Sequence, residues 1–375
     1  MAALFTPVKL GSITFPNRIG MAALTRNRTT ATVPNDIMLK YYLQRVKGGA
    51  GLIVSEAILT SRQGTEWPAA PGIWEQAQID GWKKITDGVH EAGGKVYAQI
   101  WHTGRVSHPD APQQIEAGVP VYAPSAISAR GGKFRFISGA PGYVTPTEIP
   151  DPRVLIAQFK QAAINAKEAG FDGVEVHGAN GYVVHQFLDS TSNQRTDEWG
   201  GSPENRSRFL IEIMKALVEV WGPDAAVKLS PAGGYNDMGM PLQETIDTFG
   251  YLLGELDKLG LAYVCLVRYS EMLDPEFDGK KRATPHDVPS TYSPFLPNTP
   301  VVVNCGLTPA EAEDYVASGK AAAVSFGMSF INHPDLGRRI KEGKPLDNAI
   351  DFRYLYGAEG VDPALGYVDY KEAEY

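Results

Sequence analysis

Eight short apolar runs that alternate with amphipathic segments predict a (β/α)8 barrel, the TIM barrel fold. Two further observations agree with this fold. Several of the runs are almost wholly apolar, as expected of parallel strands buried on both faces, and Gly (39) and Pro (27) are frequent enough for many short loops. The 375 residues contain no linker, charge block or low-complexity stretch, so we expect one domain over 1–375.

The predicted strands are short and finish in polar, aromatic or small side chains. In a barrel of this kind the functional site lies where the strands end, so these end residues are the candidates for chemistry. The strands are expected at 18–24, 51–58, 95–102, 173–179, 226–231, 263–269, 301–306 and 322–328.

The predicted helices follow most of the strands and carry start and stop signals. Ser-Pro-Glu opens the helix at 202–221 and Gly-Pro closes it, while Thr-Pro-Ala-Glu opens the helix at 308–317. The helices are expected at 34–47, 79–92, 153–169, 202–221, 242–259 and 308–317.

Three stretches depart from the regular alternation. Residues 270–300 hold six prolines, so we expect mostly loop with one short helix there. Residues 103–152, after the third strand, are far longer than a usual connection and predict a capping loop, within which 133–137 could form a small extra strand. The tail from residue 351 is rich in Tyr and Gly.

Composition excludes several classes of protein. The formal net charge is −8 and there is no run of Lys and Arg, so a nucleic-acid partner is not expected. No apolar stretch is long enough to span a bilayer, so no membrane partner is expected either. Two cysteines, Cys265 and Cys305, make no disulfide framework, and we expect a cytoplasmic protein.

The strand ends also exclude several chemistries. They hold no paired Asp or Glu, no Gly-x-Ser-x-Gly and no phosphate-binding loop, and no Gly-x-Gly-x-x-Gly follows a strand. His102 and His108, or Glu175 with His177, do not form a set of three convergent ligands, so no metal is expected.

The strongest cluster of candidate residues lies at 174–182, in Val-Glu-Val-His-Gly-Ala-Asn-Gly-Tyr. His177 and Asn180 offer hydrogen-bond donors that can converge on one oxyanion, and Tyr182 offers a phenolic proton beside them. By themselves, a His and Asn so spaced can be a structural pair, and Tyr182 can be a core tyrosine. The set can polarise a carbonyl and deliver a proton, so redox chemistry would need a cofactor.

Lys228 is the second informative residue. It stands in an apolar strand, where a buried ammonium without a partner is costly, and this favours a functional role. Trp101 can belong either to the core or to a pocket, and Cys305 is expected to serve packing rather than reactivity.

Motifs along nearly the whole chain resemble the old yellow enzyme family of FMN-dependent NAD(P)H ene-reductases. Besides residues 174–182, they are Leu-Phe-Thr-Pro-Val at 4–8, Asn-Arg-Ile at 17–19, Gln-Ile-Trp-His at 99–102, Phe-Leu-Asp at 187–189, Gln-Arg-Thr-Asp-Glu at 194–198, Gly-Gly-Ser-Pro-Glu-Asn-Arg-Ser-Arg-Phe at 200–209 and Asn-His-Pro-Asp-Leu at 332–336.

The resemblance implies one FMN across the barrel mouth, with NADPH or NADH as its reductant. The side chain of Thr25 would hydrogen-bond the flavin O4, and Lys228 would place positive charge near N1 and C2=O. The backbone at 304–306 and 327–328 would receive the phosphate. The residues implied in cofactor binding are Ala23, Leu24, Thr25, Ala57, Gln99, Lys228, Asn304, Gly306, Gly327 and Met328.

The resemblance also implies the substrate side of the site. His177 and Asn180 would bind the carbonyl oxygen, hydride would pass from flavin N5 to the β-carbon, and Tyr182 would protonate the α-carbon. Trp101 and Tyr354 would shape the pocket. The implied substrates are small molecules with a C=C bond activated by a carbonyl or nitro group, such as enones and enals. The implied assembly is a monomer or a homodimer.

Three positions depart from the family pattern. Ala23 stands where the family usually has Pro, Lys228 where Arg is common, and Met328 where an Arg usually holds the phosphate. Two alternatives therefore stay open: a flavin-bound isomerase or dehydrogenase of a specialised pathway, and a non-catalytic barrel with weakened FMN binding. The loss of the charge-assisted contact at Met328 is the main support for the second alternative.

Overall fold

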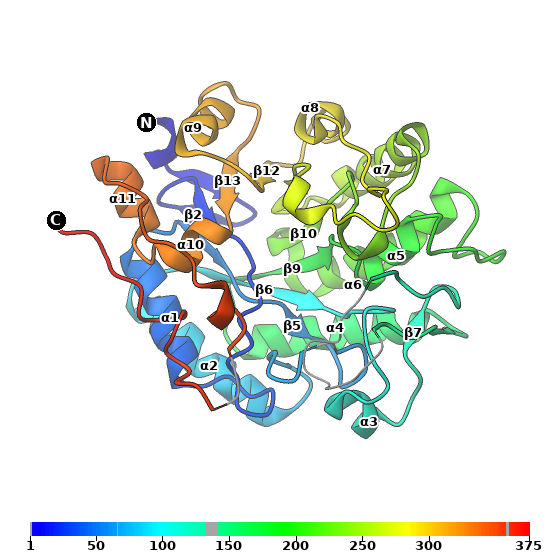
Figure 1. Cartoon of the computed structure of the whole chain (residues 1–375). Coiled ribbons are helices and arrows are strands. Elements are labelled where there is room, and N and C mark those ends of the chain that lie inside the picture. The colour runs from blue at the N-terminus through cyan, green and yellow to red at the C-terminus, as the bar shows by residue number, and fades with distance from the viewer. Residues whose placement is uncertain (1, 66, 132–141, 358–359) are drawn as a thin grey trace.

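The computed structural model describes residues 2–65, 67–131, 142–357 and 360–375 (Figure 1). Parallel strands close into a barrel, because each pairs with the next along the chain and the last, β13, pairs back with the first, β3. The predicted (β/α)8 barrel is confirmed. The barrel strands are β3 (Ile19–Met21), β4 (Leu52–Val54), β6 (Val96–Trp101), β9 (Gly173–Gly178), β10 (Ala225–Leu229), β11 (Tyr263–Val267), β12 (Val301–Asn304) and β13 (Ala323–Phe326).

The strands are shorter than predicted, because the chain leaves the ladder one or more residues before most of the expected ends. The expected strand at 51–58 is divided into β4 and β5 (Ile58–Leu59), and β5 pairs with β6 beside it. The expected strand at 322–328 ends at Phe326, and Met328 instead begins the short helix α10 (Met328–Asn332). Every residue of the eight barrel strands is buried, as the apolar runs predict.

The helices pack around the barrel in chain order (Figure 1). In α6, Ser202 Oγ accepts from the Asn205 N–H and Pro203 occupies the first position, as the sequence predicts. The helix expected at 79–92 begins earlier, because Gln78 Oε1 accepts the N–H groups of Trp74 and Glu75. The principal helices are α1 (Asp36–Lys47), α2 (Gln76–Glu91), α4 (Arg153–Glu168), α6 (Pro203–Trp221), α7 (Leu242–Leu256), α9 (Pro309–Ala317) and α11 (Leu336–Glu342).

The irregular stretches follow the sequence prediction in outline. Between β11 and β12 the structure has one short helix, α8 (Val288–Tyr292), within a region of loops and 3-10 turns. The long loop after β6 contains α3 (Pro112–Ala117) and a small parallel pair, β7 (Tyr122–Ala123) with β8 (Thr147–Glu148). The extra strand expected at 133–137 lies outside the described residues.

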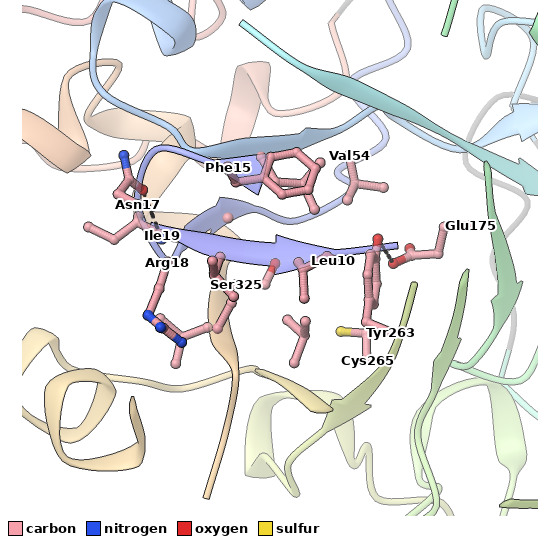
Figure 2. Close-up of a pocket in the computed structure, with 16 residues that line it drawn as sticks. Leu10, Phe15, Asn17, Arg18, Ile19, Val54, Glu175, Tyr263, Cys265 and Ser325 are labelled. Atoms are coloured by element: carbon pink, nitrogen blue, oxygen red, sulfur yellow. Dashed lines mark hydrogen bonds between the residues drawn. The ribbon is translucent and has the colours of Figure 1, made fainter. Parts of the chain in front are cut away.

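A hairpin that the sequence analysis missed covers the amino ends of the barrel strands. Its strands are β1 (Val8–Leu10) and β2 (Ile13–Phe15), joined by a turn in which Gly11 has φ +62°. Leu10 and Phe15 line a small buried cavity together with Tyr263 (Figure 2). This end of the barrel is therefore closed by apolar side chains. None of the described helices combines the length and the apolar character needed to span a membrane.

Candidate active site at the carboxyl ends of the barrel strands

The residues predicted to hold the cofactor lie in the inner wall of the barrel or in the loops that follow its strands. Thr25 follows β3 and is half-buried, and Ala57 follows β4 and is buried. Gln99 is in β6, Lys228 in β10 and Asn304 at the end of β12. The remaining candidates at these strand ends are Ala23, Leu24, Gly306, Gly327 and Met328, all half-buried or, for Gly306, exposed.

Lys228 has the environment that the sequence analysis anticipated. It is only 6% exposed and stands in register between His177 of β9 and Cys265 of β11. Within the part of the chain that the structure describes, its ammonium group has no hydrogen bond and no ion pair. A buried cation without a protein partner is costly, so the site favours an anionic or carbonyl-bearing ligand.

Gln99 presents one free acceptor to the same interior. Its Nε2 donates to Glu175 Oε1 at 2.7 Å, and its backbone N–H donates to Ser55 Oγ at 3.1 Å. Its Oε1 has no hydrogen bond to any described residue. The hydroxyl of Thr25 likewise has none among those residues. Both groups can therefore serve a heterocycle that carries N–H and carbonyl groups.

The loops after β12 and β13 leave room for contacts between backbone N–H groups of the protein and an oxygen of a ligand. Cys305 and Gly306 both have positive φ, at +83° and +66°, and a Cβ on Gly306 would meet nothing within 4 Å. Asn304 Nδ2 donates to the Ser325 carbonyl at 2.7 Å, which ties the two loops together. Met328 contributes no charge here, so a phosphate at this place would lack the charge-assisted contact that an Arg at this position would give.

His177 is prepared to donate a hydrogen bond into the barrel mouth. Its Nδ1 accepts the N–H of Ala179 at 3.4 Å, so the ring proton lies on Nε2, which has no hydrogen bond to any described residue. Burial, with the nearby charge of Lys228 and the His185 ring, holds the pKa of His177 well below its usual value. The ring is therefore a neutral donor at physiological pH.

Asn180 is held by its backbone, which leaves its side chain free. Its φ is +56°, its N–H donates to Ser230 Oγ at 2.8 Å, and its carbonyl accepts from Asn236 Nδ2 at 2.9 Å. The side-chain amide has no hydrogen bond to any described residue. His185 Nδ1 in turn accepts the Gly181 N–H at 3.2 Å, which steadies the turn after β9.

Tyr182 joins His177 and Trp101 in one aromatic cluster. The ring centroids of Tyr182 lie 4.9 Å from His177 and 4.8 Å from Trp101, and both contacts are edge-to-face. The His177 and Trp101 rings are 6.1 Å apart and nearly parallel. The structure thus brings together the predicted carbonyl-binding residue, the predicted proton donor and one predicted pocket residue.

Two tyrosines of the C-terminal segment, Tyr354 and Tyr356, have different surroundings. Tyr356 packs on Trp67, with ring centroids 4.1 Å apart, and joins the apolar cluster that contains Trp101 and Tyr182. Tyr354 instead lies beside the Arg353 guanidinium and against Gly366. The placement of Tyr354 in the substrate pocket stays a prediction, and Tyr356 is a candidate that the sequence analysis missed.

Three consecutive residues after Thr25 hold this segment in place. Arg26 donates to the carbonyls of Leu355 and Gly366, Asn27 to that of Tyr356, and Arg28 to three more carbonyls. The carbonyls that Arg28 reaches in the segment are those of Tyr354, Pro363 and Leu365. The loop next to the predicted flavin contact is therefore tied to the segment that carries Tyr356.

The sequence and the fold both match known flavoproteins. The model of the NADH:flavin oxidoreductase / NADH oxidase family matches residues 3–347. An old yellow enzyme homologue from Zymomonas mobilis superposes with a TM-score of 0.87 at 35% identity, covering 98% of this chain and 99% of that one. The chain belongs to the old yellow enzyme family.

Curated relatives within this family include reductases from fungi and plants. A flavin oxidoreductase, hxnT, of Emericella nidulans is 35% identical over 99% of this chain and 98% of its own length. The 12-oxophytodienoate reductase 7 of Oryza sativa subsp. japonica is 34% identical over 98% of this chain and 94% of its own. This old yellow enzyme is thus an oxidoreductase of a family whose cofactor is FMN.

The residues of this old yellow enzyme fit FMN. Lys228, whose ammonium has no partner among the described residues, Gln99 Oε1 and the open loop at Gly306 offer a cation, an acceptor and space, which are the kinds of contact that a flavin and its phosphate require. The sequence analysis named Glu175 only as part of a rejected metal pair. It did not single out four other supporting residues, because each is recognised only by a contact with a distant part of the chain. They are Ser230, Asn236, Tyr263 and Tyr356.

Proposed function

We propose that the protein reduces C=C bonds activated by a carbonyl or nitro group, with NADPH or NADH as the reductant and FMN as the resident cofactor. When bound, FMN supplies the hydride transfer for which the side chains of the chain have no chemistry of their own. Lys228, Gln99, Thr25, Ala57 and the loops at 304–306 and 327–328 would hold it. The 12-oxophytodienoate reductase among the relatives supports an enone as the substrate class.

One observation carries the proposal. The neutral Nε2–H of His177 and the amide of Asn180 both lack partners among the described residues, and Tyr182 lies against the His177 ring at 4.9 Å. Two neutral donors on one oxygen stabilise the negative charge that develops when a conjugated carbonyl accepts hydride at its β-carbon. Because both donors are uncharged, they can bind a neutral substrate without the desolvation cost that a buried cationic donor would add.

Tyr182 is the proposed proton donor. Its phenol is largely buried and lies at the start of α5 (Val183–Leu188), so its ring is fixed by the helix behind it and by His177 and Trp101 in front. Protonation at the α-carbon completes net reduction, whereas a site without such a donor favours isomerisation. The position of this phenol therefore supports reduction over the isomerase alternative.

The test is a visible spectrum of the purified protein under anaerobic conditions, taken before and after NADPH and again after cyclohexenone. We expect a flavin band that bleaches with NADPH and returns with the enone. A band that bleaches and does not return would remove the enone from the proposal and favour isomerisation. A protein that takes up no FMN would favour the non-catalytic barrel.

A further inference from the structure

A buried carboxylate lies beneath the proposed flavin site and has no part in the chemistry described so far. Glu175 is two residues before His177 on β9, so both side chains point into the barrel, with Glu175 one layer deeper. It is only 2% exposed. A buried carboxylate at such a place needs partners that repay its loss of water.

Two neighbouring strands supply those partners. Gln99 Nε2 of β6 donates to Glu175 Oε1 at 2.7 Å. The Tyr263 hydroxyl of β11 donates to Glu175 Oε2 at 2.8 Å, as Figure 2 shows. The strand register places the three residues in one layer, because Gln99 is opposite Glu175 and Ala226 links Glu175 to Tyr263. The carboxylate is thus held at both oxygens.

The hydrogen bond from Gln99 to Glu175 fixes the orientation of the Gln99 side-chain amide. With Nε2 directed at Glu175, Oε1 lies on the other side of the amide, where it can accept a hydrogen bond. Without the carboxylate, rotation of the amide by 180° would exchange donor and acceptor. Glu175 therefore selects the hydrogen-bonding sense of a proposed cofactor contact.

Lys228 is the second group that Glu175 influences. It stands one layer above, on β10, and its positive charge opposes the rise that burial causes in the pKa of Glu175. No carboxylate of the described residues lies within 4 Å of the Lys228 ammonium. Glu175 lies on the neighbouring strand β9, in the layer directly below this buried cation.

We propose that Glu175 is a positioning residue of the flavin site: it orients the Gln99 amide and partly neutralises Lys228, and so sets the midpoint potential of bound FMN. This inference rests on the proposed function, because it assumes FMN at the barrel mouth. The negative charge of Glu175 weakens the preference of the Lys228 cation for reduced over oxidised flavin. Removing that charge should raise the midpoint potential.

Glu175→Gln isolates the charge. The new amide can accept from Gln99 through its Oε1 and donate to the Tyr263 oxygen through its Nε2, so both contacts survive in altered form. We expect the ratio of FMN affinities, reduced over oxidised, to rise about tenfold, which corresponds to about 30 mV for a two-electron couple. Tyr263→Phe is the matched control: it keeps the charge, removes one hydrogen bond and should leave the ratio within about threefold.

The readouts are the FMN dissociation constant of the apoprotein and the midpoint potential by spectroelectrochemical titration. An unchanged potential in Glu175→Gln, with FMN bound and the fold intact by circular dichroism, overturns the inference and leaves the proposed function standing. A wild-type protein that binds no FMN overturns the proposed function itself. The two failures are therefore distinguishable.

Tyr263→Phe also provides the test if Glu175→Gln does not fold. Loss of its hydroxyl leaves the carboxylate held by Gln99 alone, so the inflection in the pH dependence of the midpoint potential should move to higher pH than in the wild type. An unmoved inflection would contradict the inference. The titratable groups around Glu175 that must stay intact are Tyr97 of β6, His177 of β9, Lys228 of β10, Cys265 of β11 and Arg18 at the cavity wall.

Discussion

The phenol ring of Tyr182 stands edge-on to the imidazole of His177, with centroids 4.9 Å apart and planes at 77°. His177 and Tyr182, which are separated by a turn in the chain, therefore lie against each other in one small part of the site. The imidazole is a neutral donor from Nε2, and the phenol is held beside it by Trp101. In the proposed mechanism Tyr182 acts only in the second half-reaction, because only that half-reaction needs a proton at carbon.

Tyr182→Phe tests that separation. The variant keeps the ring contacts with His177 and Trp101 and loses only the hydroxyl. We expect reduction of the flavin by NADPH to stay within about twofold of wild type, and enone reduction to slow by about 100-fold, the usual contribution of a general acid. Stopped-flow measurement of each half-reaction separates the two. Undiminished enone reduction would exclude Tyr182 as the proton donor.

His177→Ala tests the oxyanion site without turnover. A phenolate presents an anionic oxygen of the kind that the proposed enolate would carry. Loss of one hydrogen bond to a charged group costs about 1.5–3 kcal/mol, so phenol affinity should fall at least about tenfold. Spectral titration of the FMN-bound protein measures the dissociation constant. His90→Ala, on the outer helix α2, is the control and should bind phenol as the wild type does.

Met328→Arg tests whether the phosphate loop lacks a cation. Met328 is half-buried at the start of α10 and directly follows Gly327. A guanidinium that reaches the phosphate should tighten FMN binding by about tenfold at low salt, and part of the gain should disappear at high salt. Fluorescence quenching of FMN by the apoprotein gives the affinity. Met328→Leu keeps the apolar volume, so equal gains in both variants would argue against a charge effect.

Tyr356→Ala and Tyr354→Ala compare the two tyrosines of the C-terminal segment. Tyr356 packs on Trp67 within the cluster of Trp101, whereas Tyr354 lies on Arg353. We expect Tyr356→Ala to raise the enone KM by about tenfold through the lost apolar contact, and Tyr354→Ala to change it by less than about threefold. Steady-state kinetics with one enone decide between them. A larger effect at Tyr354 would restore the residue that the sequence resemblance implies.

Glu56→Gln tests a pH effect on stability. Burial raises the pKa of Glu56 to about 7 from 4.5, against the opposing charges of Arg26 and Arg28, and its Oε1 has no hydrogen-bond partner in the described parts of the chain. The folded state therefore holds a proton that the unfolded state releases above its lower pKa. The stabilisation is complete below about pH 4.5 and is lost as pH rises toward 7, by roughly 3 kcal/mol in all.

Urea unfolding at several pH values measures this effect. The wild-type free energy of unfolding should fall between about pH 4.5 and 7 relative to that of Glu56→Gln, whose amide does not titrate. Parallel pH profiles for the two proteins would show that Glu56 titrates with an ordinary pKa. Asp87→Asn, on the exposed face of α2, is the control for a surface carboxylate.

Some features of the candidate site could be predicted and others could not. His177, Asn180 and Tyr182 were identified because they stand close together in sequence and their residue types suit one task. Lys228 was identified because an ammonium group conflicts with an apolar strand. The resemblance pointed to Tyr354, and Tyr356, two residues away, was not considered. Of the two, it is Tyr356 that packs against Trp67.

The sequence by itself determined the barrel, the order of its strands and the face at which chemistry takes place. These features depend on local signals, such as the apolar runs and the caps at Ser202 and Thr308, which each segment carries whatever surrounds it. Only the tertiary structure decided which polar atoms are paired. The bonds of Glu175 to Gln99 and Tyr263 join residues 76 and 88 positions apart, and no local pattern predicts a partner at that distance, because strand register and barrel closure bring the partners together.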